Sequence, residues 1–183
     1  MAEFADSITM LIKNQSNNKV EMVADIIKFA TQAGYSIADV DDTKPWGGYV
    51  RFDYKDGDRF ISEFFPDINP EQARLGIPDA ELSPKILLVE PKQRLSWQVH
   101  ARRAERWKFL NDGGYYKSTS ADNPGGLIEA HAGDEVQFEA GECHRLVGAK
   151  DLYTFVAEIW QHSDKSHPSD EADITRLQDD YKR

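Results

Sequence analysis

Apolar and polar residues alternate along most of the chain after residue 84. Short alternating segments follow one another there, and turns rich in Gly, Asn and Asp separate them. Because successive side chains of a strand point to opposite faces, this pattern predicts many short strands, arranged as an antiparallel β-sandwich or a small barrel. The predicted strands are 85–90, 95–100, 105–111, 114–118, 126–130, 135–139, 144–148 and 152–161.

The N-terminal part has a helical pattern instead. Asn18, with Glu21 three residues later, has the form of a capping box, and apolar residues recur at helical spacing over 22–30. This predicts one amphipathic helix, packed on a sheet or at a dimer seam. Residues 1–17 are expected to form a short helix or a loose arm. At the other end of the chain, residues 169–183 predict a short capped helix.

The segment between helix and strands is harder to assign. Residues 36–42 are rich in turn-forming residues. Residues 49–54 and 59–65 are predicted to pair as a hairpin around a turn at 55–58. Four prolines lie within 66–84, which predicts an irregular loop. A loop of this length serves as a lid, as an oligomer contact or as a mobile segment, and the sequence leaves the three open.

Polar residues with metal-binding chemistry gather on two of the predicted strands. Ser96, Gln98 and His100 are two residues apart and therefore share one face, and Glu105 on the next strand can point to the same interior. His144 follows a Gly-containing turn and is the candidate for a fourth ligand. Imidazole, amide and carboxylate donors together suit a divalent transition metal. The sequence thus predicts a metal site at Gln98, His100, Glu105 and His144.

Composition narrows the range of functions. The chain has 183 residues, enough for one domain with a substantial core, and a formal net charge of −10. That charge disfavours nucleic acid or an anionic membrane as a partner, so no contact with either is expected. The chain has no apolar run as long as a membrane span, its first residues are acidic, and Cys143 is the single cysteine. A cytoplasmic location is therefore expected.

The spacing Gln-x-His-x4-Glu, followed by Gly-x-x-His, resembles the two cupin motifs. A longer string of residues is similar to the cupin domain of type II mannose-6-phosphate isomerases, which larger family members fuse to a mannose-1-phosphate guanylyltransferase domain. The matching residues are Lys44-Pro45-Trp46-Gly47, Lys85-Ile86, Leu95-Ser96, Gln98, His100, Arg103-Ala104-Glu105, Trp107, Gly141, His144-Arg145-Leu146, Glu158 and the tail from Asp173 to Arg183.

The resemblance implies a mainly β fold, a cupin-type double-stranded β-helix or jelly roll. In the resembled family the Pro-Trp-Gly segment opens the cupin domain. We therefore expect a cupin jelly-roll domain over 44–183, preceded by an N-terminal helical extension over 1–43. Nothing in the chain resembles a Gly-rich nucleotide loop, so nucleotidyl transfer is not expected.

The resemblance also implies a reaction, the metal-dependent aldose–ketose isomerisation of a sugar phosphate through an enediol. The residues expected to bind the substrate are Arg103, Arg145 and Arg176, because a guanidinium holds phosphate oxygens in two places. The residues expected to be catalytic are Lys85, Glu158 and Arg145. A lysine on an apolar face can supply a neutral amine as the base, whereas Glu158 is either a catalytic carboxyl or the partner of a basic residue.

The cofactor implied is one divalent metal ion, Zn²⁺ first, with Mn²⁺, Co²⁺, Ni²⁺ or Fe²⁺ as alternatives. Two other functions stay open. One is a metal-dependent cupin of another reaction class, such as an oxygenase, and the other is a non-catalytic sugar-binding or regulatory cupin. A homodimer is expected, since jelly-roll domains often pair sheet edges.

Overall fold

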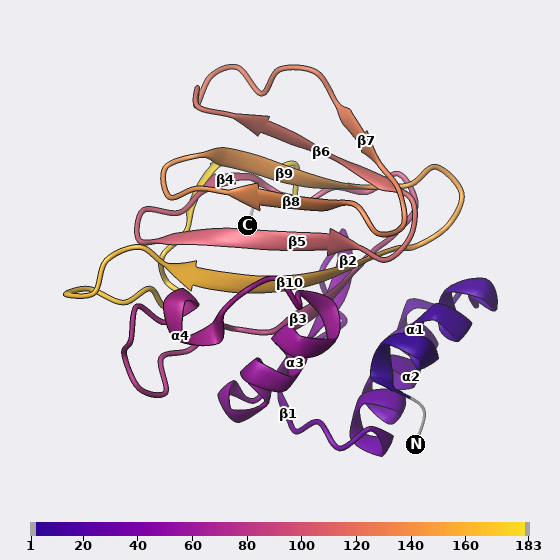
Figure 1. Ribbon diagram of the computed structural model, residues 1–183. Coiled ribbons are helices and arrows are strands. Elements are labelled where there is room, and N and C mark those ends of the chain that lie inside the picture. The colour runs from indigo at the N-terminus through magenta and orange to yellow at the C-terminus, as the bar shows by residue number, and fades with distance from the viewer. Residues whose placement is uncertain (1–2, 182–183) are drawn as a thin grey trace.

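Two antiparallel β-sheets form the centre of the computed structural model, which describes residues 3–181 (Figure 1). All eight strands predicted after residue 84 are present, and the mainly β jelly-roll prediction is confirmed. The first sheet contains, in spatial order, β1 (Ile37–Asp41), β2 (Gly47–Phe52), β3 (Lys85–Val89), β10 (Thr154–His162), β5 (Arg103–Phe109) and β8 (Glu135–Phe138). The second contains β11 (Thr175–Gln178), β4 (Trp97–Val99), β9 (Cys143–Gly148), β6 (Gly113–Ser118) and β7 (Ile128–Ala130).

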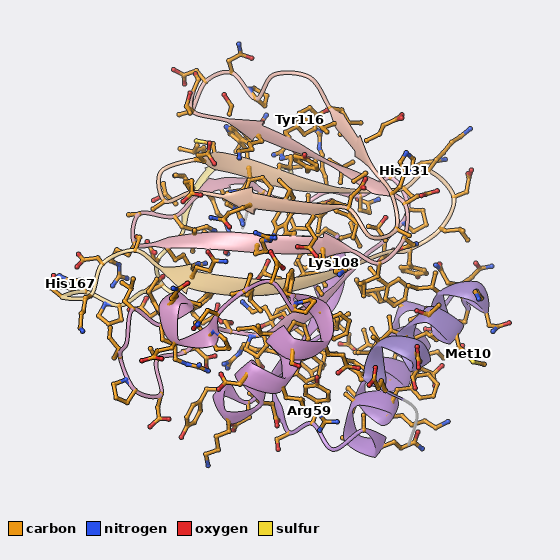
Figure 2. All side chains as sticks on the ribbon, in the orientation of Figure 1. Met10, Arg59, Lys108, Tyr116, His131 and His167 are labelled. Atoms are coloured by element: carbon orange, nitrogen blue, oxygen red, sulfur yellow. The ribbon has the colours of Figure 1, made fainter. Side chains whose placement is uncertain are left out.

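Apolar side chains from both sheets fill the space between them (Figure 2). Trp107 and Phe109 of β5 and Phe138 of β8 pack there with Leu146 of β9, and all four are buried. Because strand residues alternate, the polar residues of the site share this inner face with the apolar core. The inner face therefore places charged groups in a largely dry environment.

Helices cover the outer face of the first sheet (Figure 1). Phe155 and Ala157 of β10 point outward and pack against them, whereas Val156 and Glu158 point inward. Both faces of β10 are consequently buried, which explains its long apolar sequence. The helices are α1 (Phe4–Lys13), α2 (Lys19–Gln32), α3 (Gly57–Phe64) and the short α4 (Pro70–Ala73).

The predicted start of the amphipathic helix is confirmed. The Asn18 side chain accepts hydrogen bonds from the backbone N–H groups of Val20, at 3.0 Å, and Glu21, at 3.4 Å. Of the two states expected for residues 1–17, the described part is helical, because α1 occupies Phe4–Lys13. Exposed side chains of α1, such as Met10, point away from the sheets (Figure 2).

The predicted hairpin over 49–65 is wrong, because its second half is helical. Phe60, Ile61 and Phe64 lie at helical spacing and bury one face of α3 in the outer core. The Asp53 side chain caps the preceding turn of 3-10 helix (Tyr54–Asp56) by accepting from Lys55 N. The predicted loop over 66–84 is mostly irregular, but it contains α4, which Asn69 caps.

The predicted C-terminal helix is also wrong, since the segment forms strand β11. Thr175 and Arg176 pair with Val99 and Gln98 of β4, which would otherwise leave an edge of the second sheet open. Backbone pairing at an open edge thus outweighs the local helical pattern. The tail thus folds back on the domain.

β1 lies within residues 36–42, where the sequence predicts only turns, and it pairs with β2. The helices before it share one buried core with the first sheet. The division into residues 1–43 and 44–183 stays a prediction, although the first part packs directly on the second. No helix within residues 3–181 combines the length and the apolar character that a membrane span needs.

Candidate metal centre

Three buried side chains from both sheets meet at one point between them. Nε2 of His100 lies 3.0 Å from Oε1 of Glu105, and Nε2 of His144 lies 3.2 Å from Oε2 of the same carboxylate. His100 follows β4, Glu105 is on β5, and His144 is on β9. One donor atom from each residue lies within 4.8 Å of the others, so this group can hold a metal ion.

Gln98, the fourth predicted ligand, lies beside these three. Its Cα pairs with that of His144 across β4 and β9, and its Nε2 is 3.5 Å from His144 Nε2. Its Oε1 accepts a hydrogen bond from Ser96 Oγ at 2.8 Å. A half turn of the amide exchanges oxygen and nitrogen, which would aim the oxygen at the donors while the nitrogen faces Ser96.

Backbone carbonyls hold both imidazole rings. His100 Nδ1 is 2.5 Å from the carbonyl oxygen of Asp173, and His144 Nδ1 is 3.2 Å from that of Glu142. A carbonyl only accepts, so each Nδ1 carries a hydrogen, and in a neutral ring the lone pair is then on Nε2. That tautomer is the one that a metal-ligating histidine needs.

The charges and unsatisfied atoms of this group fit a divalent cation. His100 Nε2 and Glu105 Oε2 are buried and have no hydrogen-bond partner within residues 3–181, which is costly in a dry interior unless an ion satisfies them. Burial opposes the charge of Glu105, but His100, His144 and Arg103 hold its pKa well below the usual value. Burial lowers the pKa of His144, against the pull of Glu105. The site thus combines the carboxylate of Glu105 with the neutral imidazole of His144.

A cavity of about 170 Å³ opens beside the donors, between the two sheets. Gln98, His100 and Glu105 line it, together with residues from the C-terminal segment. Most of the other residues that line it are polar or charged. The full set of these other lining residues is Lys44, Trp46, Tyr49, Lys85, Leu87, Leu95, Ser96, Arg103, Glu158, Glu171, Ile174 and Arg176.

Lys85 and Glu158, both predicted as catalytic, face each other in this cavity. They pair across β3 and β10, and Lys85 Nζ donates to Glu158 Oε1 at 3.4 Å. Trp107 Nε1 donates to the other oxygen, Oε2, at 2.9 Å. Burial raises the pKa of Glu158 to about 7, the nearby charge of Glu105 adds to this, and Lys85 opposes it. Glu158 is therefore a carboxyl that exchanges its proton near neutral pH.

The three arginines predicted to bind the substrate differ in position. Arg176 lines the cavity from β11. Arg103 also lines it, but its guanidinium stacks on Trp160, 3.8 Å from the ring centroid, and its Nε donates to Glu105 at 3.1 Å. Its Nη1 donates to the oxygens of the C-terminal segment. Arg103 consequently orients the site, and Arg176 is the freer of the two.

Arg145 is not among the residues that line the cavity, so its role in catalysis and substrate binding stays a prediction. Its Nη2 donates to the carbonyl oxygen of Gln178 at 3.0 Å and lies 3.6 Å from Asp180. It lies on the face of β9 opposite His144, because neighbouring residues of a strand point to opposite sides. Arg145 therefore fastens the C-terminal segment to the second sheet. Arg183, also in the matching tail, lies outside the described residues.

Two residues of the site were missed at the level of sequence. Glu171 reaches the cavity, and Asp173 holds His100 through its carbonyl and caps the turn before β5 with its carboxylate. Both were missed because the sequence analysis assigned residues 169–183 to a C-terminal helix. The match of Asp173 to the resembled family was the one available signal.

Comparison with known proteins supports the fold. No protein-family model matches the chain, and no curated protein matches it. Among solved structures, the capsular polysaccharide assembling protein CapF from Staphylococcus aureus is similar over 87% of this chain and 40% of CapF, with 13% identity and a TM-score of 0.50. The chain thus spans well under half of CapF, and the likeness concerns the fold alone.

Two cupin structures are similar over shorter stretches. A Cupin 2 conserved barrel domain protein from Salinispora arenicola shares 20% identity over 43% of this chain and 61% of its own, with a TM-score of 0.37. A sugar phosphate isomerase from a cupin superfamily, from Silicibacter pomeroyi, shares 15% identity over 45% of this chain and 51% of its own, with a TM-score of 0.39. The two antiparallel sheets themselves show the jelly-roll fold, and the likeness to CapF agrees with it.

Proposed function

We propose that this protein is a metal-dependent sugar-phosphate isomerase that interconverts an aldose and a ketose, similar to mannose-6-phosphate isomerase. The observation that carries the proposal is the position of Glu158. This carboxyl, with a pKa of about 7, lines the same cavity as the donors His100 and Glu105. Moving a carbonyl to the next carbon requires a group that removes a proton from one carbon and returns it to the other.

His100, Glu105 and His144 would hold one divalent ion, with Gln98 beside them as a further ligand. Zn²⁺ is the first choice, since two imidazoles, a carboxylate and an amide oxygen match its preferences, and Mn²⁺, Co²⁺, Ni²⁺ or Fe²⁺ also suit these donors. When bound, such an ion supplies electrostatic stabilisation for negative charge on the substrate's oxygen atoms.

Glu158 is the proton-transfer group in this proposal. Its deprotonated form accepts the proton from the carbon next to the carbonyl, which yields the enediolate. Its protonated form returns the proton to the neighbouring carbon, while the hydroxyl proton passes to the former carbonyl oxygen. Trp107 and Lys85 hold its two oxygens, so the carboxyl keeps one orientation through both transfers. Lys85 lies between two carboxylates, Glu158 and Glu171. This environment favours a role for Lys85 as a positive charge in the site over a role as the base.

Basic residues explain how an acidic protein would bind an anionic substrate. The net charge of the chain is −10, yet Lys44, Lys85, Arg103 and Arg176 all line one cavity. Low-dielectric walls strengthen their attraction for an anion. A sugar phosphate fits this combination of cations and carboxyl groups better than a neutral sugar does.

The test is an isomerisation assay by NMR in D₂O with the purified chain, loaded in turn with Zn²⁺, Co²⁺ and Mn²⁺. A panel of sugar phosphates that includes mannose 6-phosphate is supplied. Deuterium entering the carbons next to the carbonyl is the expected result, because the enediol exchanges its proton with solvent. A panel that stays inert with every metal would refute the proposal, and sugar binding without exchange would indicate a binding protein.

A second candidate rests on the same donors. Two histidines and one carboxylate are also the ligand set of non-haem Fe²⁺ oxygenases. Oxygen consumption by the Fe²⁺-loaded chain, with no deuterium exchange in sugar phosphates, would favour that candidate. The isomerase remains the stronger proposal, since an oxygenase gives no reason for the Lys85–Glu158 pair.

A further inference from the structure

Glu171 lines the cavity together with Lys85, and its carboxylate also meets two hydrogen-bond donors next to the cavity, Ser83 and Arg51. Its Oε1 accepts a hydrogen bond from Ser83 Oγ at 3.0 Å and lies 3.2 Å from Lys85 Nζ and 3.7 Å from Arg51 Nε. A single oxygen is thus shared by one hydroxyl and two cations. Donors that converge in this way on one point form a site for an anion.

The donors are built into the first sheet. Arg51 and Lys85 pair across β2 and β3, and Ser83 precedes Lys85 by two residues. Ser83 is fully buried, and Lys85 is 7% exposed. Glu81 holds Ser83 and Arg51 in place, because its carboxylate accepts a hydrogen bond from Ser83 N at 2.6 Å and pairs with Arg51 at 3.3 Å. The donors therefore keep their positions whether or not Glu171 contacts them.

Glu171 itself is held much less firmly. Its side chain is 57% exposed, and its polar contacts within the described chain are those with Ser83, Lys85 and Arg51. The turn that carries it is fixed on both sides, since Ser169 N donates to His162 and the Asp173 carboxylate accepts from two backbone amides. The side chain can therefore swing into solvent while the turn stays in place.

The size of the cavity indicates that Glu171 must move. With Glu171 in its lining, the cavity measures about 170 Å³, whereas small-molecule sites usually have about 300 to 1,000 Å³. A phosphate group offers more oxygens than a carboxylate and binds the same kind of donors. It can thus replace Glu171 without leaving Lys85 or Arg51 unpaired.

We propose that Ser83, Lys85 and Arg51 form the subsite for the phosphate group of the substrate, and that the Glu171 carboxylate occupies it until the substrate displaces it. The assignment rests on the proposed function in that it takes the substrate to be a sugar phosphate. Glu171 lowers the apparent affinity for phosphate, because only the fraction of molecules with an open subsite can bind. It also excludes ligands too weakly charged to compete.

The experiment compares Glu171→Gln with Asp170→Asn in the full chain with its metal. Both variants remove one negative charge, but Asp170 pairs with Arg102 instead. Isothermal titration calorimetry with inorganic phosphate is expected to show a Kd about tenfold lower for E171Q, which corresponds to about 1.4 kcal/mol, and a Kd within about twofold of the wild-type value for D170N.

Arg51→Gln identifies where the phosphate binds. It is expected to raise the phosphate Kd about tenfold and to leave the metal content unchanged, because Arg51 contacts none of His100, Glu105 and His144 in the described contacts. The gain from E171Q should disappear in the double variant. Mannose, which lacks the phosphate, should bind equally to wild type and E171Q.

Three outcomes would overturn the subsite. The first is an unchanged or higher phosphate Kd in E171Q. The second is weaker mannose binding in E171Q, which would make Glu171 a sugar ligand. The third is no phosphate binding by any variant. Because the titration measures binding alone, its result is independent of the exchange assay in D₂O. Phosphate binding as described, with no deuterium exchange, would refute the isomerase and keep the subsite. Deuterium exchange without the described phosphate binding would refute the subsite and keep the isomerase.

Discussion

Asp173 is expected to stabilise both the fold and the candidate metal centre. Its carboxylate accepts hydrogen bonds from the backbone N–H groups of Ala101, at 2.9 Å, and Arg102, at 3.0 Å, and from Ser169 Oγ at 2.7 Å. Its own carbonyl oxygen is the partner of His100 Nδ1. The change Asp173→Ala removes the carboxylate and frees the backbone that orients His100.

The magnitude follows from these three bonds. A lost hydrogen bond to a charged acceptor costs about 1.5 to 3 kcal/mol in a buried setting, but Ala101 is exposed, so water can replace part of the loss. We therefore expect D173A to lower the free energy of unfolding by about 3 kcal/mol, and Asp173→Asn, which keeps one acceptor oxygen, by about half as much. Metal affinity should fall about tenfold, the lower end for the loss of such an orienting partner.

The assay is urea unfolding of the metal-free chain, with chelator competition for metal affinity. Asp164→Asn is the matched control, because Asp164 accepts from two backbone amides and a serine hydroxyl as Asp173 does, but these hydrogen bonds are exposed to solvent. Little change is expected from D164N. A D173A variant within about 0.5 kcal/mol of wild type, or equal effects of D164N and D173A, would refute the reasoning.

The pH dependence of this contribution has a defined sign. Burial alone would raise the pKa of Asp173, but its hydrogen bonds with the two amides and Ser169 and the charge of Arg103 lower it below 3.8. The folded state therefore favours the ionised form. The difference in stability between wild type and D173A is expected to be complete above about pH 4 and to shrink as the pH falls further. Unfolding curves from pH 7 to pH 3 measure it.

Three further predictions concern the site. His144→Ala should lose most of its bound metal, whereas His131→Ala, an exposed control, should lose none. Equal metal content of the two variants by elemental analysis would mean that His144 is not a ligand. Glu158→Gln should keep its metal but isomerise at least ~100-fold more slowly, and the rise of the wild-type rate with pH, centred near pH 7, should vanish; near-normal turnover would exclude Glu158 as the proton carrier. Arg145→Gln should destabilise the chain by about 1 to 3 kcal/mol with KM unchanged, and a raised KM would show that Arg145 does meet the substrate.

Strand periodicity made the sandwich predictable. Residues 105–109 alternate, so the faces of β5 could be assigned from sequence, and Arg106 and Lys108 do point away from the core. β1 was missed because it is an edge strand with acidic residues and little burial. The helix α3 was missed because its buried aromatic residues, Phe60 and Phe64, also suit a strand.

Some residues of the candidate site could also be predicted from the sequence, and others could not. The donors His100, Glu105 and His144 were predictable because their spacing on strands is regular and their chemistry is specific. The outward position of Arg145 was also within reach of the sequence, since it follows the inward His144 directly. Glu171 was not, because its contact with Ser83 joins residues 88 positions apart through a turn with no regular pattern.

The pairing of His100 with Asp173 has a consequence for biosynthesis. A ribosome makes His100, Glu105 and His144 well before it makes the carbonyl that sets the ring of His100. An emerging chain can therefore form most of the described strands before the partner of His100 exists, and it can hold the ion at full strength only after residue 173 has joined the domain. A chain cut short before residue 173 should keep every described strand except β11 but bind the ion poorly.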